Sequence, residues 1–420
     1  MKDKRKICSV LLAGLLVVVL LATAVAGCAK PAPEEPTPPP EEPTPPPAEP
    51  EYITVGAILP LSGPISFVGM SWTRGYELYF DKINEEGGVT IGGQTYLFNY
   101  IDEDSKMSGD AAGAATRKLI HQDGATFIFG AIIEGATAAI ADVASEAGVP
   151  HIICSVNIPG HPVDIGPDKP LTARLFISHD TTNTINFDYL LEAYPDVKTV
   201  AIVHPDLGYE GMVVDATYVA EQRGLEVVLV KPWDFFTTTD FVPTMTEVLA
   251  AEPDAIMCMV TANAPEMMLA ARQLGYTGPM WGNIPLGPEV YVLIMGAEAA
   301  TDIFTNGINL DEPTEIQQEI MDRWAAKYGE PFIGDAVLSW DGAWILVQAM
   351  EKAQSVDGEA VMAALDTMTE LGDLETCFGP GYMGEGDRFG VNRVLVRPLP
   401  ITRIMNGVVE LIDFRYGSHR

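Results

Sequence analysis

The chain has 420 residues, of which 58 are Asp or Glu and 25 are Lys or Arg, giving a formal net charge of −33 at pH 7. This negative charge repels nucleic acid and anionic lipid headgroups, so it argues against a nucleic-acid partner. The length is sufficient to bury the cores of two domains.

The N-terminus has the parts of an export signal. Basic residues precede an apolar run at 10–21, which is shorter than the roughly 20 residues that span a bilayer. The N-terminal segment closes with Val25-Ala26-Gly27-Cys28, which resembles the end of a bacterial lipoprotein signal. The resemblance implies removal of 1–27 and a lipid on Cys28; an uncleaved anchor is the alternative. Either way, we expect an extracytoplasmic body whose only attachment to the membrane is this anchor.

Residues 28–50 are expected to form a disordered tether behind the lipid-anchored Cys28. Residues 29–50 contain no hydrophobic residue larger than alanine apart from proline, and Glu-Glu-Pro-Thr-Pro-Pro-Pro occurs twice between 34 and 47. Such a composition cannot bury a core. Proline favours the polyproline II conformation at about 3.1 Å per residue, so the tether could reach roughly 70 Å.

The body begins with alternating strands and helices. Strands are predicted at 53–59, 98–101, 126–129 and 151–154, and helices at 109–121, at 135–147 and around Trp72, Tyr76, Phe80 and Ile83, which recur at helical spacing. This alternation predicts a parallel sheet with helices on both faces.

The alternation then restarts, which predicts a second lobe. Strands are expected at 175–177, 199–203, 226–230, 255–260 and 280–282, and helices at 182–193, 209–222, 241–251 and 265–274. Three helices at 315–328, 339–353 and 358–367, a glycine-rich loop at 379–390, and a hairpin at 401–412 around Asn406-Gly407 follow. The predicted fold class is α/β, with two doubly wound parallel-sheet lobes joined by a hinge.

The sequence gives little support to metal or cofactor chemistry. Cys154, Cys258 and Cys377 are too widely separated for a zinc pattern, and buried free thiols are expected for the first two, with one disulfide left open. The histidines form no i, i+4 pair, and no nucleophile elbow, phosphate-binding loop or dinucleotide fingerprint is present. We therefore expect no cofactor, no metal and no enzymatic activity, with an enzyme kept as a remote alternative.

Several local sequences together resemble one family. They are 55–64 (VGAILPLSGP), 81–89 (DKINEEGGV), 135–139 (GATAA) with 146–150 (EAGVP), and 340–343 (WDGA). They resemble the periplasmic solute-binding proteins of the branched-chain amino acid type, the two-lobed type I receptors of ABC importers. The resemblance implies a monomer that captures a small molecule between its lobes by hinge closure and delivers it to a membrane permease.

The family architecture also implies domain limits and pocket positions. Lobe 1 would comprise 51–171 and 308–390, and lobe 2 would comprise 172–307 and 391–420, with crossings near 157–174, 305–309 and 389–392. The positions expected to contact ligand are Phe67, Glu134, Ser155, Asn157, Tyr209 (or Leu207), Asn263, Trp281, Asn283 and Trp340.

Two departures from the family pattern concern the ligand. The start of the third helix reads Ile133-Glu134-Gly135, where the family places hydroxyl residues that hold the α-carboxylate, and the lobe 2 acid is replaced within 282–285. A carboxylate at a helix N-terminus disfavours a ligand anion there. Our hypothesis is that the ligand is not a standard branched-chain amino acid, and that Glu134 meets a cationic or hydrogen-bond-donating ligand or caps its own helix. A sensor that reports ligand to a signalling partner is the alternative to transport.

Overall fold

The computed structural model describes residues 50–132, 134–154, 165–177, 179–206, 210–259, 263–282 and 287–417. The signal segment, Cys28 and the tether lie outside these residues, so their predictions stay predictions. Residues 48–420 form one compact unit.

Nine strands form the first sheet, in the order β12-β13-β14-β6-β5-β4-β1-β3-β2. Its parallel centre consists of β3, β1, β4, β5, β6 and β14, and the antiparallel pairs β2–β3, β12–β13 and β13–β14 complete its two edges. The strands are β1 Glu51–Leu59, β2 Val89–Ile91, β3 Gln94–Asp104, β4 Phe127–Gly130, β5 His151–Ile152, β6 Thr172–Ile177, β12 Leu374–Thr376, β13 Gly379–Gly384 and β14 Val394–Val396.

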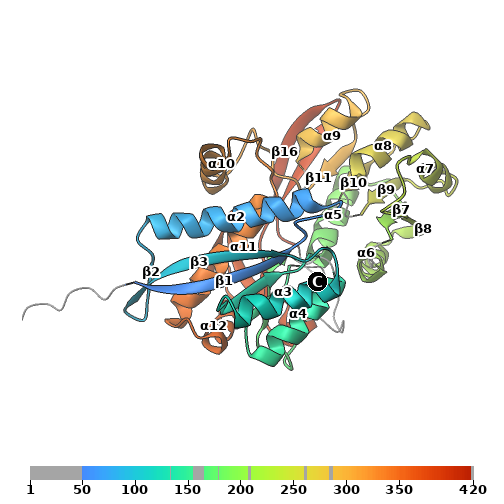
Figure 1. Ribbon diagram of the computed structural model, residues 1–420. Helices are drawn as coiled ribbons and strands as arrows, with labels where there is room; N and C mark the ends of the chain where they lie inside the picture. Colours follow the sequence, from blue (N-terminus) through green and yellow to red (C-terminus); the bar gives the residue numbers. More distant parts are fainter. Residues whose placement is uncertain are drawn as a thin grey trace, which may run out of the picture. The chain divides into compact units, whose positions relative to one another are not determined.

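Helices cover both faces of this sheet (Figure 1). The helices are α2 Ser66–Glu85, α3 Gly109–His121, α4 Glu134–Ala147, α10 Glu315–Tyr328, α11 Ala336–Ala353, α12 Gly358–Leu365 and the short α13 Gly386–Phe389. On one face α2 and α11 pack together over a core that contains Trp72, Tyr76 and Phe129. On the other face α3 and α4 bury Leu119 and Ile140 against the sheet. We call this sheet with its helices lobe 1.

The second sheet has the order β16-β15-β11-β10-β9-β7-β8. Its members are β7 Thr199–Pro205, β8 Glu226–Trp233, β9 Ala255–Cys258, β10 Met280–Gly282, β11 Ile303–Thr305, β15 Leu399–Met405 and β16 Val408–Arg415. All pairs are parallel except β11–β15 and β15–β16. Its helices are α5 His179–Ala193, α6 Glu210–Gln222, α7 Val242–Leu249, α8 Ala264–Gln273 and α9 Pro288–Met295.

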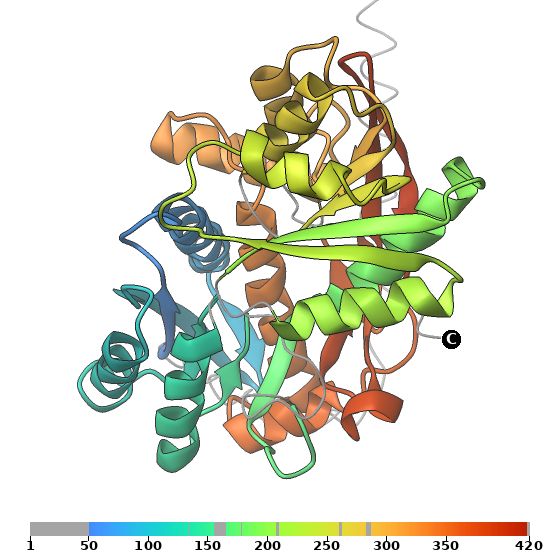
Figure 2. The same ribbon diagram turned by 90° about the vertical axis from the view of Figure 1, so that its right-hand side faces the viewer.

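Two apolar cores cover the faces of the second sheet. One contains residues of α5 and α6, such as Phe187 and Met212, and the other contains residues of α7, α8 and α9, such as Met245, Met267 and Tyr291. Figure 2 shows β7 and β8 side by side, with α6 along them. We call this sheet with its helices lobe 2. The predicted fold class is confirmed.

Several predicted elements have the bounds that the sequence indicated. This holds for α3, α10 and β10, and the predicted tail hairpin is formed by β15 and β16. Asn406 and Gly407 both have positive φ, 53° and 75°, as the tight turn of this hairpin requires. The glycine-rich segment 379–390 is not a loop, because it contains β13 and α13.

The sheets place two lobe limits later than the sequence predicted. The predicted start of lobe 2 at residue 172 assigned β6 to lobe 2, but β6 pairs with β5 and β14 in the first sheet. The predicted limit at 391 likewise separated β14 from lobe 1, to which it belongs. The chain therefore crosses between the sheets after β6, at 305–309 and at 396–399.

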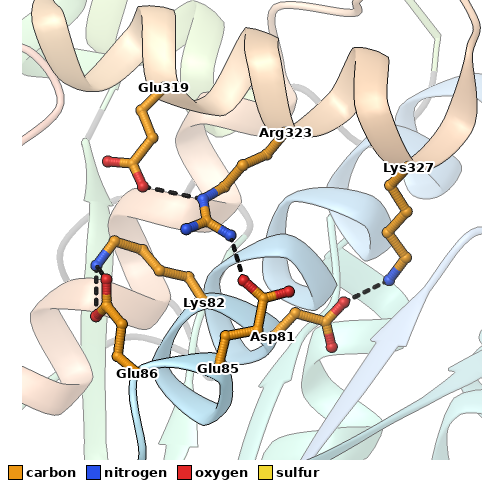
Figure 3. A network of polar contacts seen from close by, with 7 residues as sticks. All are labelled: Asp81, Lys82, Glu85, Glu86, Glu319, Arg323 and Lys327. Carbon is orange, nitrogen blue, oxygen red and sulfur yellow. Dashed lines mark hydrogen bonds and ion pairs between the residues drawn. The ribbon is translucent and has the colours of Figure 1, made fainter.

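Ion pairs attach α10 to α2 on the surface of lobe 1 (Figure 3). Arg323 of α10 contacts Glu85 of α2 at 2.9 Å and also bonds Glu319 within its own helix. One turn further, Lys327 contacts Asp81 at 2.6 Å. These side chains are partly exposed, so the network orients α10 more than it stabilises the fold.

Candidate functional site

The candidate site consists of the carboxyl ends of the parallel strands in both lobes, where ligands bind in doubly wound folds. In lobe 1, β1 leads into α2 and β4 into α4; in lobe 2, β7 leads into α6, β9 into α8 and β10 into α9. These connections bring the starts of the helices to the same edge of each sheet.

Phe67 lies in the first turn of α2, and 39% of its surface is exposed. The preceding loop is fixed because the backbone N–H of Leu61 donates to Asp104 Oδ1 at 3.0 Å. Gly69 keeps the helix start close to β1, since a Cβ at this position would overlap the carbonyl of Pro60. The aromatic ring predicted to contact ligand is therefore presented at the strand end by a rigid backbone.

Asn263 is the N-cap residue of α8 and is partly exposed. Glu134 is the first residue of α4, as expected, but its side chain lies outside the described part of the structure. Ser155, Asn157, Leu207, Tyr209 and Asn283 also lie outside it. The roles of all these residues remain predictions.

The two tryptophans expected to contact ligand are core residues. Trp281 is fully buried, stacks on Phe304 with ring centroids 5.3 Å apart, and meets Phe187 edge to face. Trp340 is 2% exposed and packs edge to face against Tyr79 in lobe 1. We therefore leave both rings out of the proposed pocket, because apolar packing already accounts for their positions.

Acidic residues occupy the starts of several helices in both lobes. Glu266 lies in the first turn of α8 and Glu289 in that of α9, and burial raises the pKa of both carboxyls. Asp335, which precedes α11, is 8% exposed, and its burial raises its pKa to about 7. Carboxyl groups at such positions oppose the attraction of helix N-termini for anions.

Buried side-chain amides link segments near the crossings between the lobes. Asn186 of α5, which follows the first crossing, donates to Asn306 in the second at 2.9 Å. Asn306 in turn donates to the carbonyl of Pro400, just after the third crossing, at 3.0 Å. A short polar chain therefore links α5, the second crossing and the start of β15.

The three cysteines within the described residues are free and buried, which confirms the thiols predicted for Cys154 and Cys258. Burial raises the pKa of each of these two thiols to about 12, so neither is a reactive thiolate at neutral pH. Within the described ranges, no three His, Cys, Asp or Glu side chains are grouped to hold a metal ion. In the same ranges, no helix has the length and apolarity needed to cross a bilayer.

Two parallel-stranded lobes joined by three crossings define a two-lobed α/β binding protein, and comparison with known proteins agrees. The sequence pattern of the periplasmic binding protein family matches residues 52–407, so the chain belongs to this family.

Curated relatives carry leucine-binding names. A Leu/Ile/Val-binding protein homolog 7 from Brucella suis is 26% identical over 81% of this chain and 86% of its own length. The Leu/Ile/Val-binding protein BraC3 of Rhizobium johnstonii is 27% identical over 79% of this chain and 88% of its own.

Solved structures share the fold. The isoleucine complex of the branched-chain amino acid transporter substrate-binding protein LivJ from Streptococcus pneumoniae superposes with a TM-score of 0.69 at 21% identity, covering 87% of this chain and all of that one. A solute-binding protein of an ABC transporter from R. palustris, in complex with benzoate, gives a TM-score of 0.67 at 20% identity, covering 87% of this chain and 97% of its own. These similarities confirm the family that the sequence motifs indicated.

Proposed function

We propose that the protein is the substrate-binding component of an ABC importer. It captures a small polar, amino-acid-like or aromatic solute between its lobes and delivers it to a membrane permease. The observation that carries the proposal is the pair of parallel-stranded lobes joined by three crossings. Such a hinge lets the closed state gain contacts from both lobes when ligand fills the gap.

The ligand we propose carries a positive charge or several hydrogen-bond donors, and it is not a standard branched-chain amino acid. Glu266 and Glu289 place carboxyl groups at the starts of α8 and α9, which follow β9 and β10 of lobe 2, Asp335 precedes α11 of lobe 1, and the sequence adds Glu134. An α-carboxylate would find no cation among these carboxyl groups, whereas an amine or another hydrogen-bond donor would find acceptors. The relatives' names and the isoleucine and benzoate complexes describe those proteins; the ligand class proposed for this chain rests on its own acidic helix starts.

A thermal-shift screen tests this proposal. The unit 48–420 is heated with amino acids, amides, aromatic acids and polyamines, and a ligand at a hundred times its Kd should stabilise the folded state by about 2.7 kcal/mol. Titration calorimetry then measures the affinity of each hit and of leucine. Leucine binding at micromolar affinity or tighter would refute the proposed ligand class, while an uptake defect on gene deletion separates transport from sensing.

We further propose an extracytoplasmic location with lipid on Cys28 as the only membrane attachment, and a monomeric body. The predicted chemistry is tested by metabolic labelling with a fatty acid. The wild-type chain should incorporate label and remain with the membrane, whereas Cys28→Ser should not incorporate it. Equal labelling of both chains would contradict the anchor. Sedimentation of the unit 48–420 tests the monomer.

A further inference from the structure

A charged contact joins the two lobes. Arg388 of α13, in lobe 1, places Nη2 3.1 Å from Oδ1 of Asp215 of α6, in lobe 2. The other carboxylate oxygen of Asp215 accepts a hydrogen bond from Asn183 of α5 at 3.0 Å. Asp215 is only 7% exposed, so its carboxylate is enclosed by groups from both lobes.

The lobe 1 partner of this contact is rigidly held. Phe389, next to Arg388, is buried among Ile153, Ile165 and Val394. The guanidinium groups of Arg388 and Arg174 lie 5.5 and 5.6 Å from the centre of its ring. The backbone of α13 is thus fixed to the lobe 1 core, and a movement of lobe 2 would separate Asp215 from Arg388.

Other charges surround the contact. Glu385, directly before α13, is partly buried, and its burial raises its pKa to about 7, an effect that Arg174 of β6 opposes and Asp215 reinforces. Burial raises the pKa of Asp215 to about 6, and Asn183 of α5 opposes this shift. The groups that face Asp215 are therefore Asn183 from α5, Arg388 and Glu385 from the α13 segment, and Arg174 beyond them.

The energetic consequence depends on the relative position of the lobes. A carboxylate that has lost its water is costly unless a cation and hydrogen-bond donors replace the water. In the observed arrangement Arg388 and Asn183 supply them. If the lobes separate, Asp215 loses Arg388 but regains water, so the contact biases the equilibrium between the two arrangements without being required for folding of either lobe.

We propose that Arg388 and Asp215 form an interlobe clasp, which holds the lobes in the observed relative position and opens when the hinge opens. The proposal rests on the hinge movement of the proposed function. It adds a contact that sets the relative position of the lobes before any ligand binds. The contact therefore affects how much binding free energy a ligand must supply to hold the lobes in the closed arrangement.

Distances between spin labels test the clasp without any ligand. Asp110→Cys in α3 and Phe236→Cys after β8 place one label on the exposed surface of each lobe, and Cys154, Cys258 and Cys377 are buried. The measurement uses the unit 48–420, which contains every described element. With the clasp intact we expect one narrow distance distribution. Asp215→Asn and Arg388→Gln should each broaden it or move it by several ångströms.

The matched control removes an ion pair inside lobe 2. Arg223, which directly follows α6, contacts Asp188 of α5, with Nη2 3.1 Å from Oδ2, so Arg223→Gln removes an ion pair next to α6 without touching lobe 1. It should leave the distribution unchanged. Because Arg388 is partly exposed, Arg388→Gln should fold even if Asp215→Asn does not. An Arg388→Gln distribution identical to wild type would overturn the clasp. Since no ligand is used, that result would leave the proposed ligand binding standing.

Discussion

Asp341 shows how a single residue supports the hinge. Its carboxylate and the guanidinium of Arg397 are each 1% exposed and lie 2.8 Å apart, although not aligned as a hydrogen bond. Asp341 also accepts the backbone N–H of Cys377 at 2.8 Å, and Arg397 stacks over the ring of Phe378 at 3.8 Å. Burial raises the pKa of Asp341 and lowers that of Arg397, while each charge opposes the shift of the other. Since Arg397 lies in the third crossing, this pair fixes the lobe 1 end of the hinge.

Asp341→Asn is therefore expected to destabilise the protein strongly. It leaves the charge of Arg397 buried without a counter-ion, and breaking a buried pair in this way costs about 3–5 kcal/mol. Urea denaturation of both proteins measures the loss. The control is Asp366→Asn, which removes the partner of Arg393 at a carboxylate that is 34% exposed and should cost less. Equal losses at the two sites would contradict the role assigned to burial.

At the scale of elements, α10 is defined by its ends. Thr314 Oγ1 accepts the N–H of Gln317, the Gln317 side chain accepts the N–H of Thr314, and both side chains donate to the carbonyl of Cys377 at 2.9 Å. Gly329 ends the helix at a φ of 64°. The capping box therefore starts the helix and also attaches it to lobe 1.

Thr314→Ala should lower the free energy of unfolding by about 1–2 kcal/mol, because it removes the cap of α10 and one bond to Cys377. Ser108 provides the control: it is the N-cap residue of α3 but its side chain makes no capping hydrogen bond. Ser108→Ala should therefore change stability much less. Thermal and urea unfolding measure both changes. A comparable loss of unfolding free energy from the two substitutions would show that the hydrogen bonds of the capping box do not stabilise the protein.

Helix caps and tight turns are local signals, and they explain which elements the sequence predicts correctly. The bounds of α10 and of the tail hairpin could be predicted because Thr314, Gly329 and Asn406-Gly407 specify ends and turns through local chemistry. The segment 379–390 was misread as a loop because its glycines serve packing between strands. At Gly381, for example, a Cβ would lie 2.9 Å from Thr376 and 3.1 Å from the carbonyl of Val396. Such a need is visible only when the neighbouring strands are known.

The sequence predicted the positions of some candidate site residues but not of others. Phe67 could be placed because the loop after the first strand has a fixed position in the fold. The indoles of Trp281 and Trp340 could not be assigned, because an aromatic residue at the end of an element fits a pocket and a core equally well. Only the positions of Phe304 and Tyr79 decide between them.

At the scale of the whole molecule, the large negative charge makes stability depend on pH. With 58 acidic and 25 basic residues, self-repulsion at neutral pH opposes the compact state. Several carboxyls are also buried with raised pKa values: Asp215 at about 6, and Asp335 and Glu385 at about 7. Proton binding reduces both the charge repulsion and the cost of burying ionised carboxyls. Mild acid should therefore raise the free energy of unfolding.

The sign of the effect follows from proton uptake. A carboxyl whose pKa is raised above its unfolded value of roughly 4 contributes stability fully below that value, and loses it as the pH rises through its folded pKa, here between about 6 and 7. Asp254 acts in the opposite sense, because the N–H of Lys198 lowers its pKa and its contribution is lost only in stronger acid. Stability should therefore be greatest between these limits.

We accordingly expect the melting temperature to be higher at pH 5.5 than at pH 8 when ionic strength is held constant. Scanning calorimetry of the unit 48–420 measures both values. Asp335→Asn removes one of the buried carboxyls while keeping its shape, so it should reduce the difference between the two pH values. Asp387→Asn, at an exposed carboxyl in α13, should leave the difference close to that of the wild type. A melting temperature that rises steadily from pH 5.5 to pH 8 would mean that these acids are ionised in the folded protein, and that their burial costs less than the structure implies.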